Sequence, residues 1–158
     1  MTKHTPKTIL VICTGNMCRA PMAEAFLKTA LIPKNGFTTR SAGTSAVNGA
    51  TATPEAVQVM EERGIDISKH VSTRVSKTII ENADIILVMS RTHKNILSKK
   101  FPGHENKIFI YKEYADTVNE SRDVPDPIGQ PMEVYRKVRN EIERASEGII
   151  EKLRGYLE

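Results

Sequence analysis

Cysteine, aromatic residues and long apolar runs are scarce in this sequence. Its 158 residues include two cysteines, no tryptophan, four tyrosines and four phenylalanines. Two cysteines cannot supply the several disulfides of a small secreted scaffold. No apolar run approaches the roughly 20 residues that a membrane-spanning helix needs, and the apolar stretch after the first residues is too short for a signal peptide. We therefore expect a cytoplasmic protein with no membrane partner.

The excess of positive charge is also small. The sequence has 23 Lys and Arg residues and 19 Asp and Glu residues, which give a formal net charge of +4. With no recognition motif beside it, this excess argues against nucleic-acid binding. The 39% hydrophobic content is typical of a globular chain long enough for one buried core. No repeat or linker interrupts the sequence. We expect a single domain over residues 1–158.

Short apolar runs and helix-forming segments alternate along the chain. The predicted strands are 8–13, 37–41, 83–89 and 107–111, and the predicted helices are 21–30, 54–63, 91–100 and 133–157. This alternation is typical of an α/β fold, here a doubly wound, four-stranded parallel sheet with helices on both faces. Ligands of such folds bind beyond the carboxyl ends of the strands. The loop after the first strand is therefore the first place to look for a site.

That loop reads Cys13-Thr-Gly-Asn-Met-Cys-Arg19 and leads into a helix that opens near Pro21. A turn at a helix N-terminus directs backbone N–H groups into one concavity and binds anions. It lacks the patterns of nucleotide and dinucleotide loops. Donors and a guanidinium favour a thiolate over a thiol, so we expect Cys13 to ionise readily. Alone, Cys13 would be a packing residue and Arg19 a surface charge, but together they favour a cysteine nucleophile and a phosphate ligand.

The same segment resembles the active-site signature of the low-molecular-weight protein tyrosine phosphatases, a Cys-x5-Arg loop with an internal Gly-Asn. The resemblance covers nearly the whole chain. It implies that Cys13 attacks phosphorus and forms a phosphocysteine, without a metal or cofactor. The phosphate-binding residues that it implies are Thr14, Gly15, Asn16, Met17, Cys18 and Arg19. Implied partners are phosphorylated proteins, with inorganic phosphate or other oxyanions as product or inhibitors.

Three supporting roles also follow from the resemblance. Asn16 is expected to hold the loop through a left-handed backbone, which asparagine tolerates. Cys18 is expected to form a reversible disulfide with Cys13 that protects the nucleophile from further oxidation, although a packing role is the alternative. Ser41 and His70 match the hydrogen-bond network behind the loop, whereas His70 taken alone would be an ordinary surface histidine.

The leaving group needs a proton, and an acidic segment offers one. Residues 113–132 contain five acidic residues and one basic residue, and within them lies Asp126-Pro127. On its own this Asp-Pro-x-Gly sequence is a turn. In the family, the matching aspartate is the general acid and then the general base, so the resemblance assigns these roles to Asp126. Asp123 is the second candidate for the acid.

One residue departs from the family pattern. Where the family has Ser or Thr directly after the arginine, this chain has Ala20. Losing one hydroxyl donor to the thiolate costs about 1.5–3 kcal/mol of its stabilisation. We expect slower turnover or a higher pKa of Cys13, and a catalytically weakened phosphate-binding module is one alternative function.

The substrate is less well defined than the chemistry. Tyrosine-specific members carry aromatic rings after the Asp-Pro, but here Ile128-Gly129 follows, as in the bacterial protein arginine phosphatases of the family. The non-polar Met17 in the loop is instead typical of the tyrosine enzymes. We take protein tyrosine phosphatase as the main hypothesis and protein arginine phosphatase as the alternative. An arsenate reductase is disfavoured, because this chain has no cysteine after Cys18.

Overall fold

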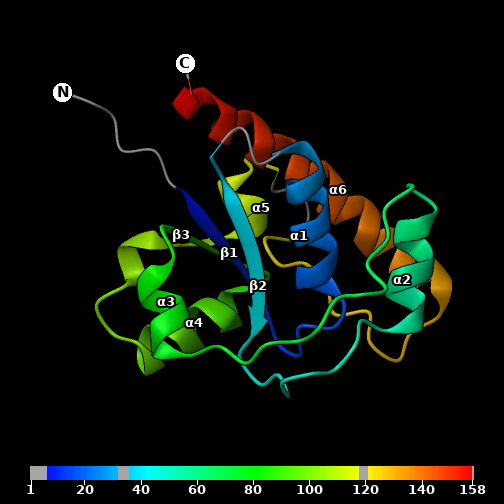
Figure 1. The fold of residues 1–158 in the computed structure, drawn as a ribbon, viewed down its shortest axis with the longest axis horizontal. Coiled ribbons are helices and arrows are strands. Elements are labelled where there is room, and N and C mark those ends of the chain that lie inside the picture. Colours follow the sequence, from blue (N-terminus) through cyan, green and yellow to red (C-terminus); the bar gives the residue numbers. More distant parts are fainter. Residues whose placement is uncertain (1–6, 32–35, 118–120, 158) are drawn as a thin grey trace.

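The computed structural model describes residues 7–31, 36–117 and 121–157. Its centre is a parallel sheet of four strands, as predicted, and the strands lie in the order β2-β1-β3-β4. Figure 1 labels β1, β2 and β3 of this sheet. The strands are β1 Thr8–Cys13, β2 Thr38–Gly43, β3 Ile85–Val88 and β4 Ile108–Ile110. Because all four are parallel, their carboxyl ends lie along one edge of the sheet. Residue 13 and the segments after residues 43 and 88 therefore meet there.

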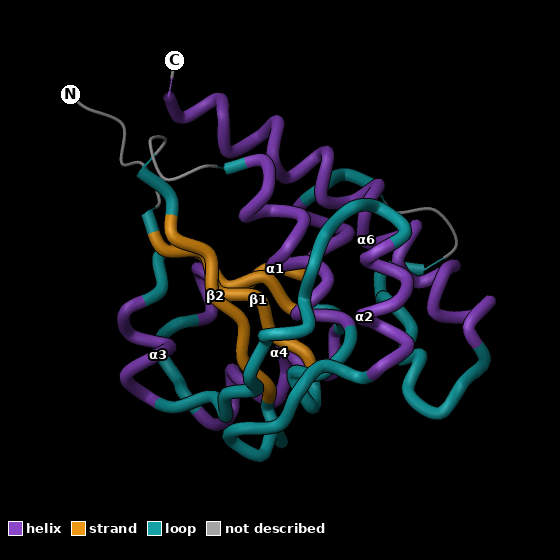
Figure 2. Tube along the Cα trace, turned by 45° about the vertical axis from the view of Figure 1, so that its right-hand side comes forward, coloured by secondary structure: helices purple, strands orange, loops and turns teal. Residues whose placement is uncertain are grey.

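Helices cover both faces of the sheet (Figure 2). Alternate β1 side chains enter two separate apolar cores: Ile9 and Val11 pack on one face, and Leu10 and Ile12 on the other. The helices are α1 Arg19–Ala30, α2 Pro54–Glu61, α3 Lys77–Asn82, α4 Arg91–Lys100, α5 Tyr111–Tyr114 and α6 Met132–Arg154. Residues of α1, α2, α5 and α6 build the larger core, whereas α3 and α4 contribute to the smaller one.

Most predicted boundaries are off by one to three residues, and α3 and α5 were not predicted. The strand expected over 107–111 ends at Ile110, because the chain turns into α5 and the Tyr111 hydroxyl lies 2.6 Å from Ser146 Oγ of α6. The helix expected over 133–157 ends at Arg154 and continues as a 3-10 turn. Helix α3 has only six residues, too few for a periodic pattern, and begins where Ser76 accepts a hydrogen bond from the Ile79 N–H.

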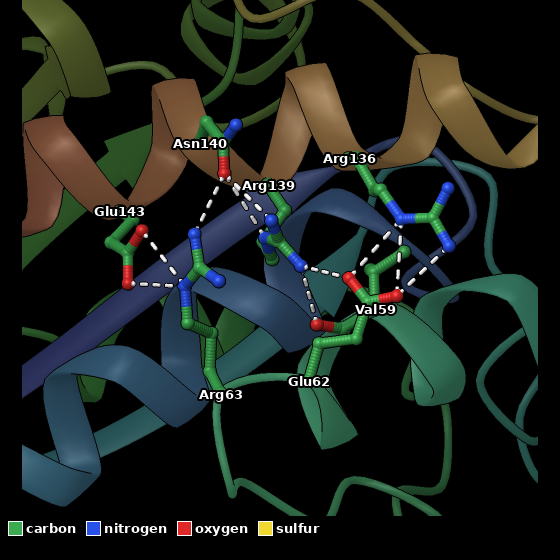
Figure 3. Close-up of polar contacts among 7 residues, drawn as sticks. All are labelled: Val59, Glu62, Arg63, Arg136, Arg139, Asn140 and Glu143. Atoms are coloured by element: carbon green, nitrogen blue, oxygen red, sulfur yellow. Dashed lines mark hydrogen bonds and ion pairs between the residues drawn. The ribbon is translucent and has the colours of Figure 1, made fainter.

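Charged side chains join the end of α2 to α6 (Figure 3). Glu62 pairs with both Arg136 and Arg139, and Arg63 pairs with Glu143. Arg139 is 4% exposed and also donates to the Val59 carbonyl, 2.9 Å away. These contacts fix α2, whose first turn lies beside the loop between β1 and α1. Among the described residues, no helix is both long and apolar enough to cross a membrane.

Candidate active site

The loop between β1 and α1 is held by the segments that follow β2. Thr44 N–H donates to the Cys13 carbonyl and Ser45 N–H donates to the Thr14 carbonyl, each over 2.9 Å. A Cβ on Gly43 would lie 2.4 Å from the Thr14 oxygen and 2.9 Å from the Asn16 nitrogen. Only glycine therefore allows the end of β2 to approach the loop this closely. Sequence reasoning missed Gly43, because nothing near it in the chain marks the contact.

Asn16 is at the turn of the loop. Its φ is 57°, in the left-handed region, and it is completely buried. The side-chain oxygen accepts from Thr73 N–H at 2.9 Å, and the backbone N–H donates to Cys13 Sγ at 3.3 Å. Its Nδ2 has no hydrogen-bond partner among the described residues. The left-handed backbone thus directs one loop N–H at the thiol.

Cys13 is 2% exposed at the end of β1. Burial raises the pKa of its thiol above the ordinary value of 9.0, while the Ala20 N–H, the Arg19 charge and the Asn16 N–H lower it. The expectation that Cys13 ionises readily therefore needs correction. The donors are in place, but removal of the thiol from water has the larger effect on its pKa.

Cys18 is buried, 5% exposed, and is also a free thiol. Its Sγ is 3.4 Å from Thr53 Oγ1 and 3.5 Å from the Tyr135 hydroxyl. Thr53 also caps α2 by accepting from the Ala56 N–H. The two hydroxyl partners were not predicted, since they come from distant segments. The disulfide with Cys13 stays a prediction.

Arg19, the first residue of α1, is 5% exposed and has a partner on each side. Nη1 donates to the Val124 carbonyl at 3.0 Å, and Nη2 donates to Thr14 Oγ1 at 3.4 Å. Nη2 also lies 3.5 Å from Asp126 Oδ2, whose side chain is 44% exposed. The guanidinium therefore links the loop to the acidic segment.

The structure separates the roles of the two candidate acids. Asp123 Oδ1 accepts from the Arg91 N–H at the start of α4, 2.9 Å away, and the next residue, Val124, donates from its N–H to the Met89 carbonyl. Asp123 is thus an anchor for the acidic segment. Asp126, by contrast, directs one carboxylate oxygen at Arg19 and keeps part of its surface open to solvent.

Behind the loop, a polar chain connects β2, α1 and the segment around residue 70. Ser41 Oγ donates to Glu24 Oε1 at 2.6 Å, and His70 Nδ1 lies 3.8 Å from the same oxygen. His70 Nε2 donates to the Asn16 carbonyl at 2.7 Å. Ser41 therefore reaches the loop only through Glu24, which sequence reasoning missed because the helix pattern gave it no special position.

A groove of about 860 Å³ runs along this network. Glu24, Ser41 and His70 line it, whereas Cys13 and Arg19 do not. It is therefore separate from the loop that carries Cys13 and Arg19. Within the described ranges, no group of three His, Cys, Asp or Glu side chains could hold a metal ion.

Comparisons with known proteins agree with this geometry. Residues 8–156 match the family model described as low molecular weight phosphotyrosine protein phosphatase. A protein-arginine-phosphatase of Geobacillus stearothermophilus is 38% identical over 94% of this chain and 97% of its own. A probable low molecular weight protein-tyrosine-phosphatase of Ralstonia solanacearum, EpsP, is 36% identical over the same shares.

Solved structures give the same result. The YwlE arginine phosphatase from G. stearothermophilus superposes with a TM-score of 0.87 at 37% identity, covering 95% of this chain and 94% of that one. A low molecular weight protein tyrosine phosphatase from T. tengcongensis has a TM-score of 0.85 at 38% identity, covering 92% and 99%. Matched from strand β1 to the end of α6, the chain belongs to the low molecular weight phosphotyrosine protein phosphatase family and is a hydrolase of phosphorylated proteins.

Proposed function

We propose that this protein removes phosphate from phosphotyrosine in proteins, with Cys13 as nucleophile, Arg19 as phosphate ligand and Asp126 as general acid and base. The observation that carries the assignment is the contact between Arg19 Nη2 and Asp126 Oδ2 at 3.5 Å. It brings a carboxyl group to the guanidinium that lies in the loop with the cysteine. Acid and nucleophile then flank one phosphoryl group.

In the first step, the thiolate of Cys13 attacks phosphorus, so that an S–P bond forms and the ester P–O bond breaks. Asp126, in its protonated form, gives its proton to the departing tyrosine oxygen. The loop N–H groups and Arg19 bind the phosphoryl oxygens, and Arg19 is suited to bidentate contacts. Its buried position beside Val124 and Thr14 fixes it in advance of substrate binding.

In the second step, the carboxylate of Asp126 takes a proton from water, and the resulting hydroxide attacks phosphorus. The S–P bond breaks, the cysteine leaves as a thiolate, and inorganic phosphate is the product. The N–H groups of Asn16 and Ala20 and the charge of Arg19 stabilise that thiolate. Inorganic phosphate and other oxyanions should therefore inhibit competitively.

Two substitutions test the mechanism. Cys13→Ser should abolish the metal-independent hydrolysis of p-nitrophenyl phosphate, since the hydroxyl is a far weaker nucleophile. Asp126→Asn should slow an ester with a poor leaving group about 100-fold or more, and slow p-nitrophenyl phosphate much less, because only the poor leaving group needs a proton. Steady-state rates on both esters provide the measurement.

Asp123→Asn is the matched control, since its amide oxygen can still accept from the Arg91 N–H. It should leave the ratio of the two rates unchanged. Full activity of Cys13→Ser would refute the nucleophile, and an equal effect of Asp126→Asn on both esters would reassign the acid.

Phosphoarginine is the second candidate substrate. Ile128, which follows the acid and is 53% exposed, offers no ring to an aromatic substrate, and one relative at 38% identity is named an arginine phosphatase. Against this, Met17 offers a thioether, which packs on aromatic rings and is only a weak acceptor for a guanidinium. The arginine phosphatase and the tyrosine phosphatase structures are about equally similar to this chain. The choice between the two substrates therefore rests on Met17 and Ile128.

Rates on matched phosphotyrosine and phosphoarginine peptides decide between the substrates. We expect faster hydrolysis of phosphotyrosine, because the apolar Met17 in the loop suits a ring better than a charged group. A higher kcat/KM on the phosphoarginine peptide would transfer the assignment to that substrate, with the same catalytic residues.

A cytoplasmic location is part of the proposal. Both cysteines are free thiols, and the nucleophile works only when reduced, as the cytoplasm keeps it. No metal, cofactor, nucleic acid or membrane takes part in the proposed reaction.

A further inference from the structure

The hydroxyl of Thr14 lies between the phosphate-binding arginine and a buried histidine. Arg19 Nη2 is 3.4 Å from Thr14 Oγ1, and His93 Nε2 is 2.8 Å from the same oxygen. His93 is in the first turn of α4 and is 3% exposed. Its other ring nitrogen, Nδ1, lies 2.7 Å from Ser90 Oγ. The mechanism above does not use this histidine.

The chemistry of the donors and acceptors fixes the direction of each hydrogen bond in the series from Arg19 to Ser90. A guanidinium only donates, so Thr14 Oγ1 accepts from Arg19 and has its own proton left to donate. The acceptor of that proton is His93 Nε2, which makes Nδ1 the protonated nitrogen and Ser90 Oγ its acceptor. Ser90 Oγ also accepts from the His93 backbone N–H. The imidazole is therefore held at both nitrogens and oriented toward the loop.

This arrangement requires a neutral imidazole. Burial and the nearby charge of Arg19 lower the pKa of His93 to about 4, and the carboxylates of Asp123 and Asp126 only partly oppose them. At neutral pH, His93 thus accepts a proton from Thr14 rather than adding a second positive charge beside the guanidinium.

The same corner also anchors the acidic segment. The N–H of Arg91, the first residue of α4, donates to Asp123. The carbonyl of Met89, two residues before α4, accepts from the Val124 N–H. The Val124 carbonyl in turn accepts from Arg19. The start of α4 therefore supports Arg19 from two sides, once through Thr14 and once through the acidic segment.

We propose that His93 is a positioning residue that, through the hydroxyl of Thr14, holds the guanidinium of Arg19 in the orientation that binds the phosphoryl group. His93 itself does not touch the reacting atoms. The inference rests on the proposed function, because it takes Arg19 as the phosphate ligand.

A double-mutant cycle tests this coupling, with the inhibition constant of inorganic phosphate and kcat/KM for p-nitrophenyl phosphate as readouts. Thr14→Val removes the hydroxyl at nearly the same volume, and His93→Asn shortens the side chain so that it no longer reaches Thr14. Each single substitution should raise the phosphate inhibition constant roughly threefold to tenfold, as loss of one hydrogen bond does. The double variant should be no worse than the worse single variant.

Conservative variants separate positioning from packing. Thr14→Ser keeps the hydroxyl, and His93→Gln places an amide oxygen near the position of Nε2, so both should return the inhibition constant most of the way to that of the wild type. Thr14 is exposed, so we expect Thr14→Val and Thr14→Ser to fold. Comparing these two variants can still overturn the inference where a His93 variant fails to fold. His104→Asn is the matched control, since it lies before β4, at the opposite edge of the sheet from the loop, and it should change neither readout.

Three results would overturn the inference. These are an unchanged phosphate constant in folded Thr14→Val, effects that multiply in the double variant, and a Thr14→Ser variant as impaired as Thr14→Val. A wild-type protein that neither binds phosphate nor hydrolyses the ester would overturn the proposed function as well. An active wild type with any of the three results would overturn this inference alone.

Discussion

Arg19 is a cation almost without contact with water, and its surroundings explain why it is stable there. At 5% exposure, a guanidinium with unpaired N–H groups would be strongly destabilising. Acceptors from the loop and the acidic segment surround it: Thr14 Oγ1, the Val124 carbonyl and the carboxylate of Asp126. Because the partners come from two segments, a change in either segment alters the surroundings of Arg19.

Ala20 offers the clearest single-residue test of thiol activation. Its N–H already lowers the pKa of Cys13, and Ala20→Ser adds a hydroxyl donor beside it. We expect a lower pKa of Cys13 and a kcat about tenfold higher, since a hydrogen bond to a charged group contributes ~1.5–3 kcal/mol. The pH dependence of Cys13 alkylation by iodoacetamide provides the measurement.

The thiolate accumulates above the pKa, so a lower pKa shifts that alkylation profile to lower pH. Because Ala20 is completely buried, the extra oxygen should also reduce the free energy of unfolding by about 1 kcal/mol. An unchanged alkylation profile, with the fold intact, would contradict our interpretation of Ala20.

How far the site follows from the sequence depends on where the partners lie. Cys13 and Arg19 share one short loop, so their spacing alone indicated their chemistry. Glu24 and His93 could not be found in this way, because their partners are elsewhere in the chain: Thr14 and His93 are 79 positions apart. Only the fold shows such pairs.

At the scale of elements, charged residues orient α2 against α6. Glu62 accepts from Arg136 and Arg139 at once (Figure 3), and both arginines are on α6. Hydrogen bonds from Arg136 and then Arg139 lower the pKa of Glu62 below its ordinary value of 4.5. Thr53, at the start of α2, contacts Cys18. The pairing of Glu62 with α6 therefore also stabilises the loop that contains Cys18.

Glu62→Gln should therefore destabilise the protein in a pH-dependent way. A carboxyl group whose pKa is lowered on folding stabilises the native state above its ordinary pKa, and that contribution disappears as the pH falls through the lower, folded value. We expect a lower urea midpoint for Glu62→Gln at neutral pH and a difference that closes well below pH 4.5. Urea unfolding at both pH values measures it.

Glu147→Gln, at an exposed position of α6, is the control and should match the wild type at both pH values. A gap between wild type and Glu62→Gln that stays constant with pH would show that the effect is not electrostatic.

The elements themselves were predicted well where apolar runs are long. Strand β1 is buried from Ile9 to Cys13 and matches its prediction residue for residue. Shorter elements escaped, because α3 and α5 are a turn or two long and are defined by contacts such as that of Tyr111 with Ser146. Tertiary packing rather than local pattern decides where such elements begin and end.

For the whole molecule, the two apolar cores share one sheet, and strands β1 and β3 each contribute residues to both cores. Neither core can be lost without exposing the other. A single domain over residues 1–158 therefore predicts that the whole chain unfolds cooperatively, in one transition.

Urea unfolding should show one transition, with circular dichroism and loss of activity at the same urea concentration. Inorganic phosphate, which we propose binds the folded loop, should raise the midpoint by an amount that grows with its concentration. Chloride at equal ionic strength is the control. Two separate transitions would contradict the single domain.

The parallel order of the sheet has one last consequence, for refolding. The loop at residues 13–19, the corner around residue 93 and the acidic segment near residue 126 come together only when β3 has paired with β1 and α4 has docked. Contacts between such distant parts of a chain form slowly and late. Only molecules in which these three segments have come together can be enzymatically active. The rate at which activity returns after dilution from urea therefore measures the final step of folding.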